Sequence, residues 1–222
     1  MNDAAGKEEM PQSPDEQMMR RCLALAVQSS QQHEYPFGAV VVRNGEIVAE
    51  STNRVARDRD VTHHAEIVAM AEAQRTLGST DLSDCTLYSN VEPCALCSYA
   101  IREARLARVV FALRSPVMGG FSRWNILNDR DLSTAIPHVF VPPPEVVPGV
   151  LADEADAVLR QVAPVVWAFI RANRLLLIEP QNTKPQAKQR IHTSISFLRW
   201  LIHALRLTLL DRIGRGRGKV KS

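Results

Sequence analysis

The sequence predicts an α/β fold, a three-layer α-β-α sandwich with a mixed central sheet. Segments with helical spacing of apolar residues alternate with short, mostly apolar runs, a pattern typical of helices packed on both faces of a sheet. An Asn-Gly dipeptide separates the first two apolar runs and predicts a hairpin. The length of 222 residues is sufficient for one such domain with a substantial core and additional segments.

Local signals predict the first helix and the hairpin. Ser13-Pro14-Asp15-Glu16 has the form of a capping box with proline in the first turn, and apolar residues follow at helical spacing. We therefore expect a helix over about 15–31. Residues 37–42 have the pattern of a buried strand that ends at Asn44-Gly45, and residues 47–49 supply the returning strand.

The elements that follow alternate between helix and strand. Two further helices are predicted over 64–76 and about 94–104, the second one opened by Pro93. Three further strands are predicted at 85–88, 109–112 and 138–141. Residues 150–173 have a helical pattern that Pro164 interrupts, so we expect either a kinked helix or two helices there.

Four segments differ in composition. Residues 1–14 are polar and lack the apolar core of a signal peptide, so we expect a disordered lead-in. Residues 15–178 carry the predicted elements and form the expected folded domain. Residues 179–190, with two prolines and several Gln and Lys, are expected to be a linker. Residues 191–222 combine apolar residues at near-helical spacing with many basic ones, and we expect a basic amphipathic tail.

Charge and cysteine content restrict the class of protein. Ten of the 27 Lys and Arg residues lie in 181–222 beside a single acid, Asp211, so the rest of the chain is net acidic and shows no general electrostatic footprint for nucleic acid. Four unevenly spaced cysteines do not suit a disulfide-stapled secreted fold, and Cys22 and Cys85 are expected in the core. No run of about 18 apolar residues predicts a transmembrane segment. We expect a cytoplasmic protein.

A candidate metal site comes from two segments that each open a predicted helix. Cys94 and Cys97 are three residues apart and face the same way on the first helical turn, where the helix N-terminus favours thiolates. His64, at the start of the other helix, is the expected third ligand. One His and two Cys leave the fourth position of a tetrahedral zinc ion for water, which is the composition of a catalytic site.

Glu66 indicates the chemistry of that site. It lies two residues after His64 and points in a different direction, so it need not be a ligand. Its carboxylate can take a proton from the zinc-activated water and return it to a ring nitrogen and a departing amine. Cys-x-x-Cys alone would also suit a redox motif or a structural zinc knuckle, but the combination predicts hydrolytic deamination of an exocyclic amine.

His64-x-Glu66 followed by Pro93-Cys94-x-x-Cys97 resembles the signature of the cytidine/deoxycytidylate deaminase superfamily. The similarity covers about 15–175 and is greatest to the branch of guanine deaminase, cytosine deaminase and tRNA adenosine deaminase. It implies a cytidine deaminase-like fold, a zinc cofactor and a homodimer. It also implies that Asn53 hydrogen-bonds the base and that the backbone N–H groups of Ala65 and Glu66 orient the substrate.

Aromatic residues supply candidate walls of a base pocket. Phe37, which would otherwise be core, occupies a position that resembles the pocket wall of guanine deaminases. Residues 116–125 depart from the patterns of the family. Their paired glycines predict a tight loop, in which Phe121 or Trp124 is available to stack on a planar base, to pack on the surface or to contact a second subunit.

Three hypotheses of function follow. The acidic body and the Phe37-Gly38-Ala39 segment favour a zinc-dependent hydrolase acting on a small molecule, a free nucleobase or nucleoside of guanine or cytosine type. The alternative is a tRNA adenosine deaminase that forms inosine. The basic tail, as a possible RNA contact, favours it, whereas Val61 in place of the family's proline and the loop after Ala112, which differs from that of RNA-editing members, count against it. The tail would also suit an anionic membrane or a partner surface. A zinc-stabilised, non-catalytic binding protein is the third hypothesis, and Glu66 counts against it.

Overall fold

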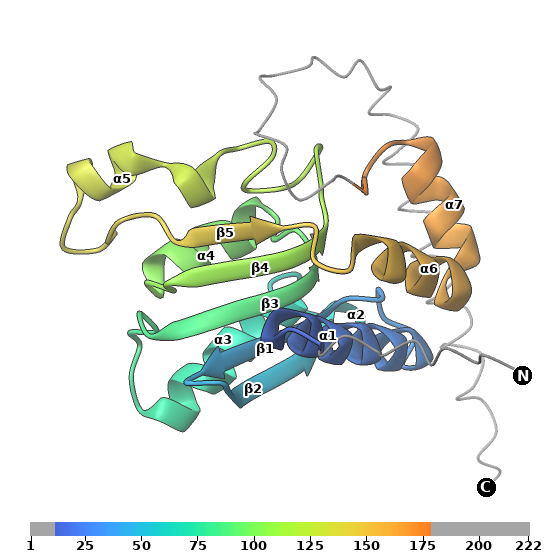
Figure 1. Ribbon diagram of the computed structural model, residues 1–222, viewed down its shortest axis with the longest axis horizontal. Coiled ribbons are helices and arrows are strands. Elements are labelled where there is room, and N and C mark those ends of the chain that lie inside the picture. The colour runs from blue at the N-terminus through green and yellow to red at the C-terminus, as the bar shows by residue number, and fades with distance from the viewer. Residues whose placement is uncertain (1–11, 179–222) are drawn as a thin grey trace, which may run out of the picture. The chain divides into compact units, whose positions relative to one another are not determined.

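The computed structural model describes residues 12–178, whose strands form one five-stranded sheet in the order β2-β1-β3-β4-β5 (Figure 1). β1 pairs antiparallel with β2 and with β3, whereas β3–β4 and β4–β5 are parallel. The sheet is therefore mixed, as predicted. The strands are β1 (Gly38–Arg43), β2 (Glu46–Thr52), β3 (Cys85–Val91), β4 (Arg108–Leu113) and β5 (Glu145–Pro148).

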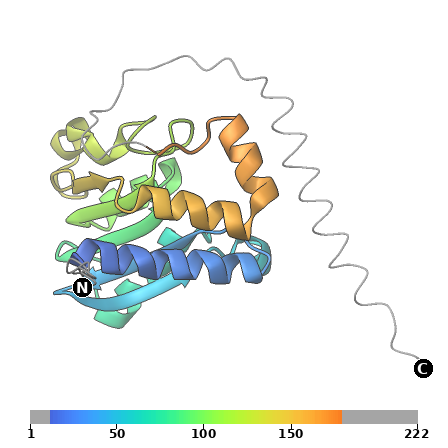
Figure 2. The ribbon, with the colours of Figure 1, turned by 45° about the vertical axis from the view of Figure 1, so that its right-hand side comes forward.

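Helices cover both faces of this sheet, and the three-layer α/β prediction is confirmed. α1 and α6 lie side by side on one face, with α7 packed against α6 (Figure 2). α3 and α4 pack on the opposite face. The helices are α1 (Pro14–Gln31), α2 (Val55–Asp58), α3 (Ala65–Leu77), α4 (Ala95–Glu103), the short 3-10 helix η1 (Ile126–Asn128), α5 (Arg130–Ala135), α6 (Ala152–Val162) and α7 (Pro164–Ala172).

Each central strand contributes to two hydrophobic cores. Ala39 and Val41 of β1 face α3 and α4, while Val40 and Val42 face α1 and α6. β4 divides its side chains between the two faces in the same way. Strands that are buried on both faces have continuous apolar runs instead of alternation, which explains the sequence pattern of β1 and β4. Full burial stabilises the fold by about 1.5–3 kcal/mol for each large aliphatic side chain.

The local signals in the sequence correspond to observed structures. The Ser13 hydroxyl accepts from the backbone N–H of Glu16, and the Glu16 carboxylate accepts from the N–H of Ser13, which is the predicted capping box. Asn44 and Gly45 both have positive φ, as a type I′ hairpin turn requires. Pro164 starts a new helix, so the helical region after residue 150 is divided into α6 and α7.

The predicted strand at 138–141 is wrong, because the edge strand β5 begins at Glu145. Two interactions hold the 138–141 segment on α4 instead. Phe140 is buried edge-on against Tyr99, and the buried Arg102 guanidinium donates to the carbonyl of Val141. Prolines 142–144 lack the N–H group that a ladder needs, so pairing starts only after them.

Several predicted segments lie outside the described residues: most of the lead-in, the linker 179–190 and the tail 191–222. Between residues 12 and 178, no helix has the length and apolar character needed to cross a bilayer.

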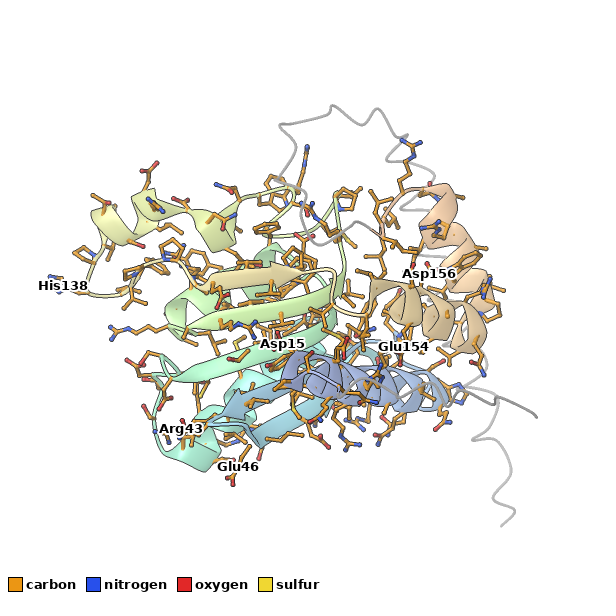
Figure 3. All side chains as sticks on the ribbon, in the orientation of Figure 1. Asp15, Arg43, Glu46, His138, Glu154 and Asp156 are labelled. Carbon is orange, nitrogen blue, oxygen red and sulfur yellow. The ribbon has the colours of Figure 1, made fainter. Side chains whose placement is uncertain are left out.

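An ion pair joins α1 to the sheet. Asp15, at the start of α1 (Figure 3), accepts two hydrogen bonds from the Arg108 guanidinium, both of 2.8 Å, and one of 2.8 Å from the Tyr88 hydroxyl. The Arg108 hydrogen bonds hold the pKa of Asp15 below its usual value of 3.8, although partial burial opposes this. The same arginine also bonds Glu145 of β5.

We predict that Asp15→Asn lowers the free energy of unfolding at pH 7 by about 1.5–3 kcal/mol, the contribution of hydrogen bonds to a charged group. A carboxyl whose folded pKa lies below its unfolded pKa stabilises the protein above the unfolded pKa, and this stabilisation is lost as the pH falls through the folded pKa. The difference between wild type and variant should therefore be constant from pH 7 to about 5 and shrink below about 4.

Urea denaturation of both proteins at a series of pH values measures this difference. If zinc dissociates at low pH, it does so from both proteins, and the effect cancels in the difference between them. Glu46→Gln, at an exposed position of β2 (Figure 3), is the control and should change little at any pH. A difference for Asp15→Asn that stayed constant down to pH 3 would contradict the assignment.

Candidate active site

The carboxyl ends of β2, β3 and β4 meet at one edge of the sheet. Thr52 pairs with Gly38, Ala39 pairs with Ser89, and Val91 pairs with Leu113, which brings these strand ends into line. The segments that follow the three strands carry the candidate ligands, Glu66, Asn53 and the glycine-containing loop, whereas Glu34 and Phe37 precede β1 at the same edge. The fold therefore gathers at this edge groups that are distant in sequence.

Three candidate metal ligands lie at the start of two helices. His64 is the N-cap of α3, and Cys94 is the N-cap of α4, both with extended backbone. Cys97 follows in the first turn of α4. The His64 Nδ1 atom lies 3.5 Å from the Cys94 sulfur and 3.4 Å from the Cys97 sulfur, and the two sulfurs are 3.7 Å apart. The structure thus brings the three predicted ligands together.

These distances fit zinc. Tetrahedral bonds of about 2.3 Å to sulfur and about 2.0 Å to nitrogen require separations of about 3.8 Å between two sulfurs and about 3.5 Å between sulfur and nitrogen. One imidazole and two thiolates also form the donor set that zinc prefers among N and S ligands. The three residues are able to hold a zinc ion and leave a fourth coordination position for water or substrate.

The electrostatics of the cluster favour a thiolate. The hydrogen bond from Cys97 lowers the pKa of the Cys94 thiol to about 4, with His64 adding to the effect. The same hydrogen bond and burial raise the pKa of Cys97 well above 9.0, while the Cys94 thiolate raises the pKa of His64. Both sulfurs lie at the N-terminus of α4, where the helix dipole stabilises negative charge.

Glu66 lies beside the cluster in the first turn of α3. The residue is only 7% exposed, and the Cys97 thiol is among the groups that influence its carboxyl group. Burial raises the pKa of Glu66 to about 7, and the negative charge of Cys94 adds to the shift. A carboxyl group with such a pKa is suited to accept and donate protons near neutrality.

Three further predicted residues lie at the same edge. Asn53 follows β2, is 2% exposed, and donates from Nδ2 to the Glu34 carboxylate at 2.9 Å. Its backbone N–H bonds the carbonyl of Phe37, so the two residues are neighbours. The Phe37 ring stacks on the Tyr35 ring, with 6.0 Å between the ring centroids. Phe37 also packs against the hydrophobic core that contains the buried residues of α3. Ala65 is fully buried as the first residue of α3.

The glycine-containing loop presents one aromatic residue to the surface and buries the other. Trp124 is 56% exposed, and the Arg123 guanidinium lies over its ring at 5.4 Å. Phe121 packs edge-on against Phe111 and belongs to the core. Of the two aromatic residues that sequence analysis considered for stacking, only Trp124 is therefore accessible.

Glu92 is a residue whose role sequence reasoning missed. It is buried immediately before Pro93-Cys94, and its carboxylate accepts from the backbone N–H groups of Ser115, Phe121 and Ser122 and from the Ser122 hydroxyl. Burial raises the pKa of Glu92, although these donors oppose the shift. The sequence did contain a signal for this role: Glu92 is an acidic residue that directly follows an apolar strand and precedes the proline of the Pro-Cys motif.

The paired glycines allow this loop to approach the ligand helix. A Cβ atom on Gly119 would lie 1.9 Å from the Glu92 carboxylate, and one on Gly120 would lie 2.0 Å from the Ser98 hydroxyl. Gly119 also forms a backbone bridge with Cys94. Glu92 and the two glycines therefore fix the loop directly against a candidate zinc ligand.

Comparison with known proteins agrees with this site. Residues 12–113 match the family model described as the cytidine and deoxycytidylate deaminase zinc-binding region. A tRNA-specific adenosine deaminase of Aquifex aeolicus is 35% identical over 128 residues, which are 57% of this chain and 85% of that protein. The tRNA(Ile)-lysidine synthase of Deinococcus radiodurans is 39% identical over 157 residues, which are 69% of this chain and 25% of that protein.

Two solved structures are also similar. One comes from a study of A-to-I editing by tRNA:A34 deaminases; it is 31% identical with a TM-score of 0.58, and the match covers 64% of this chain and 99% of that one. The guanine deaminase of Nitrosomonas europaea is 28% identical with a TM-score of 0.55, and the match covers 69% of this chain and 86% of that one.

We predict that Cys94→Ser or Cys97→Ser reduces bound zinc from about one ion per chain to less than about a tenth, because a hydroxyl replaces a thiolate ligand. Metal analysis of the purified proteins measures the loss. Cys85→Ala, which changes a buried cysteine of the core, is the matched control and should keep its zinc. Normal zinc content in both ligand variants would refute the assignment.

Proposed function

Because the chain belongs to the cytidine and deoxycytidylate deaminase family of zinc-dependent hydrolytic deaminases, we propose that it is a tRNA adenosine deaminase that converts adenosine 34 to inosine. The observation that carries this proposal is the similarity to tRNA-specific adenosine deaminases over most of their length, 85% for the Aquifex protein and 74% for a Streptococcus pyogenes protein. The sequence prediction favoured a free nucleobase or nucleoside. These relatives instead support the alternative given in the sequence analysis, a tRNA adenosine deaminase.

In this proposal, four residues of the site carry the reaction: His64, Cys94 and Cys97 as metal ligands and Glu66 as proton carrier. His64, Cys94 and Cys97 would hold the zinc ion, which would supply the Lewis acid that makes water nucleophilic near neutral pH. Glu66 takes one proton from the attacking water and delivers it to N1 of the adenine ring as oxygen bonds to C6. It then carries the second water proton to the amino group. The C6–N6 bond breaks, and inosine and ammonia are the products.

The substrate base would enter this site turned out of the RNA stack, since the cluster is reached from loops at the edge of the sheet. Asn53 would hydrogen-bond the base, and the backbone N–H groups of Ala65 and Glu66 would orient it. Phe37 would form part of the pocket wall. The proximity of Asn53 and Phe37, whose backbones are hydrogen-bonded, supports a joint role.

RNA contacts outside the pocket would come from the loop after β4 and from the basic tail. Arg123 and Trp124 offer a cation and an exposed ring next to the loop that contacts Cys94, which suits a phosphate and a stacked base. The tail, residues 191–222, lies outside the described residues, and its basic composition supports a phosphate contact. The family resemblance supports a homodimer.

A guanine deaminase is the second candidate, because guanine deaminases are among the similar structures. Among the similar structures, the identity to the Nitrosomonas guanine deaminase is 28%, against 31% for the structure from the study of tRNA:A34 deaminases. A non-catalytic protein is the least supported hypothesis, since Glu66 is buried in contact with the ligand cluster.

We predict that zinc-loaded protein releases ammonia and forms inosine from an anticodon stem-loop with adenosine 34, and not from free guanine, cytosine or their nucleosides. Glu66→Gln should keep its zinc and lower turnover by a factor of about 10²–10⁴ or more, because it removes the proton carrier. Glu72→Gln, on the exposed side of the same helix, is the matched control. Turnover of free guanine without turnover of the stem-loop would favour the second candidate.

A further prediction concerns Trp124. Trp124→Ala should raise the KM for the stem-loop by about 5- to 100-fold, the loss expected for one stacked base, while any activity on free adenosine is unchanged. The exposed Val165 of α7 provides the control variant Val165→Ala. Size-exclusion chromatography of the variant distinguishes a stacking role from a subunit contact, because only the subunit contact would change the elution volume.

A further inference from the structure

The buried carboxylate of Glu34 contacts the side-chain amide of Asn53. Glu34 follows the end of α1, is 8% exposed, and is held in place by a backbone hydrogen bond of 3.0 Å from its N–H to the carbonyl of Ser29. Its carboxylate accepts three hydrogen bonds: from Asn53 Nδ2 at 2.9 Å, from the N–H of Ala56 at 3.1 Å and from the N–H of Arg57 at 2.6 Å. Glu34 thus links α1, the end of β2 and the first turn of α2.

This arrangement fixes the amide of Asn53 in one orientation. A carboxylate only accepts hydrogen bonds, so the Asn53 atom that faces Glu34 must be Nδ2 and not Oδ1. Turning the amide over would place Oδ1 against a carboxylate oxygen inside a nearly closed site. The Asn53 backbone is also held, through its bond to Phe37. The second N–H and the carbonyl oxygen of this amide form no hydrogen bond with the described residues, so they are available to a substrate.

We propose that Glu34 is a positioning residue that fixes the donor and acceptor of the Asn53 amide for recognition of adenine. This inference rests on the proposed function. An acceptor beside a donor complements the N6 amine and N7 of adenine, which is the edge that asparagine reads in a bidentate contact. Guanine and the product base present O6 and N7, which are both acceptors, so they lack a partner for Oδ1. The pair therefore selects the substrate base against guanine and against product.

Glu34 also caps α2, and the test must separate this role from positioning. Asp129 provides a matched cap at another place, because its carboxylate accepts from the N–H groups of Asp131 and Leu132 at the start of α5. Asp129→Asn should reduce thermal stability about as much as Glu34→Gln does, without changing the KM for the stem-loop.

A double-mutant cycle on the adenosine-34 stem-loop tests the positioning role. We expect Glu34→Gln and Asn53→Ala each to lower kcat/KM by about tenfold or more, with full zinc content. In the Asn53→Ala background, Glu34→Gln should lower it by less than about twofold, because the amide that it positions is already absent. Multiplicative effects would mean that Glu34 acts through α2 alone and would overturn the proposal.

Binding provides a readout independent of turnover. In the Glu66→Gln background, the ratio of Kd values for stem-loops with guanosine 34 and adenosine 34 should be at least about tenfold, and Glu34→Gln should bring it towards one. An unchanged ratio would overturn the selectivity. If the wild type deaminated only free guanine, the proposed function and the adenine selectivity would both be wrong, and the same cycle measured on guanine would still decide whether Glu34 positions Asn53.

Discussion

The convergence of two helix N-termini at one edge of the sheet is the constraint on which the site depends. α3 begins at His64 and α4 at Cys94, and their first turns place an imidazole and two sulfurs within 3.7 Å of one another. Such a cluster concentrates polar groups in a buried place, which is unfavourable unless they are bonded to each other or to a metal. Zinc binding and the packing of the two helices against the sheet are therefore expected to stabilise each other.

Two buried carboxylates hold the loops around this cluster. Glu92 accepts from three backbone N–H groups of the loop after β4, and Glu34 accepts from two at the start of α2. Irregular segments lack the hydrogen-bonded ladders of helices and strands, so their buried N–H groups need other acceptors. Glu92 thus supplies the acceptors that the loop beside Cys94 lacks, and Glu34 caps the first turn of α2, whose N–H groups have no partner within the helix.

The fold alone does not specify the substrate, and we propose that these loops do. Proteins similar to this chain include ones named as tRNA and guanine deaminases, so similarity of fold leaves the choice of base open. The acidic composition of the body led sequence analysis towards a small molecule. Net charge describes the whole surface, whereas recognition of an RNA depends on a few cations and rings near the site.

Local signals in the sequence determined the elements and the catalytic signature, because each depends on residues close together in the chain. Ser13 and Glu16 specified the helix start, Asn44-Gly45 the hairpin, and the spacing of Cys94 and Cys97 two neighbouring thiols on one turn. The tertiary structure decided what depends on distant contacts. Because residues 138–141 pack on α4 and a proline run follows them, the edge strand lies at 145–148. Glu34 and Glu92 are buried and accept hydrogen bonds from segments distant in the chain, a role that the residues next to them in sequence do not indicate.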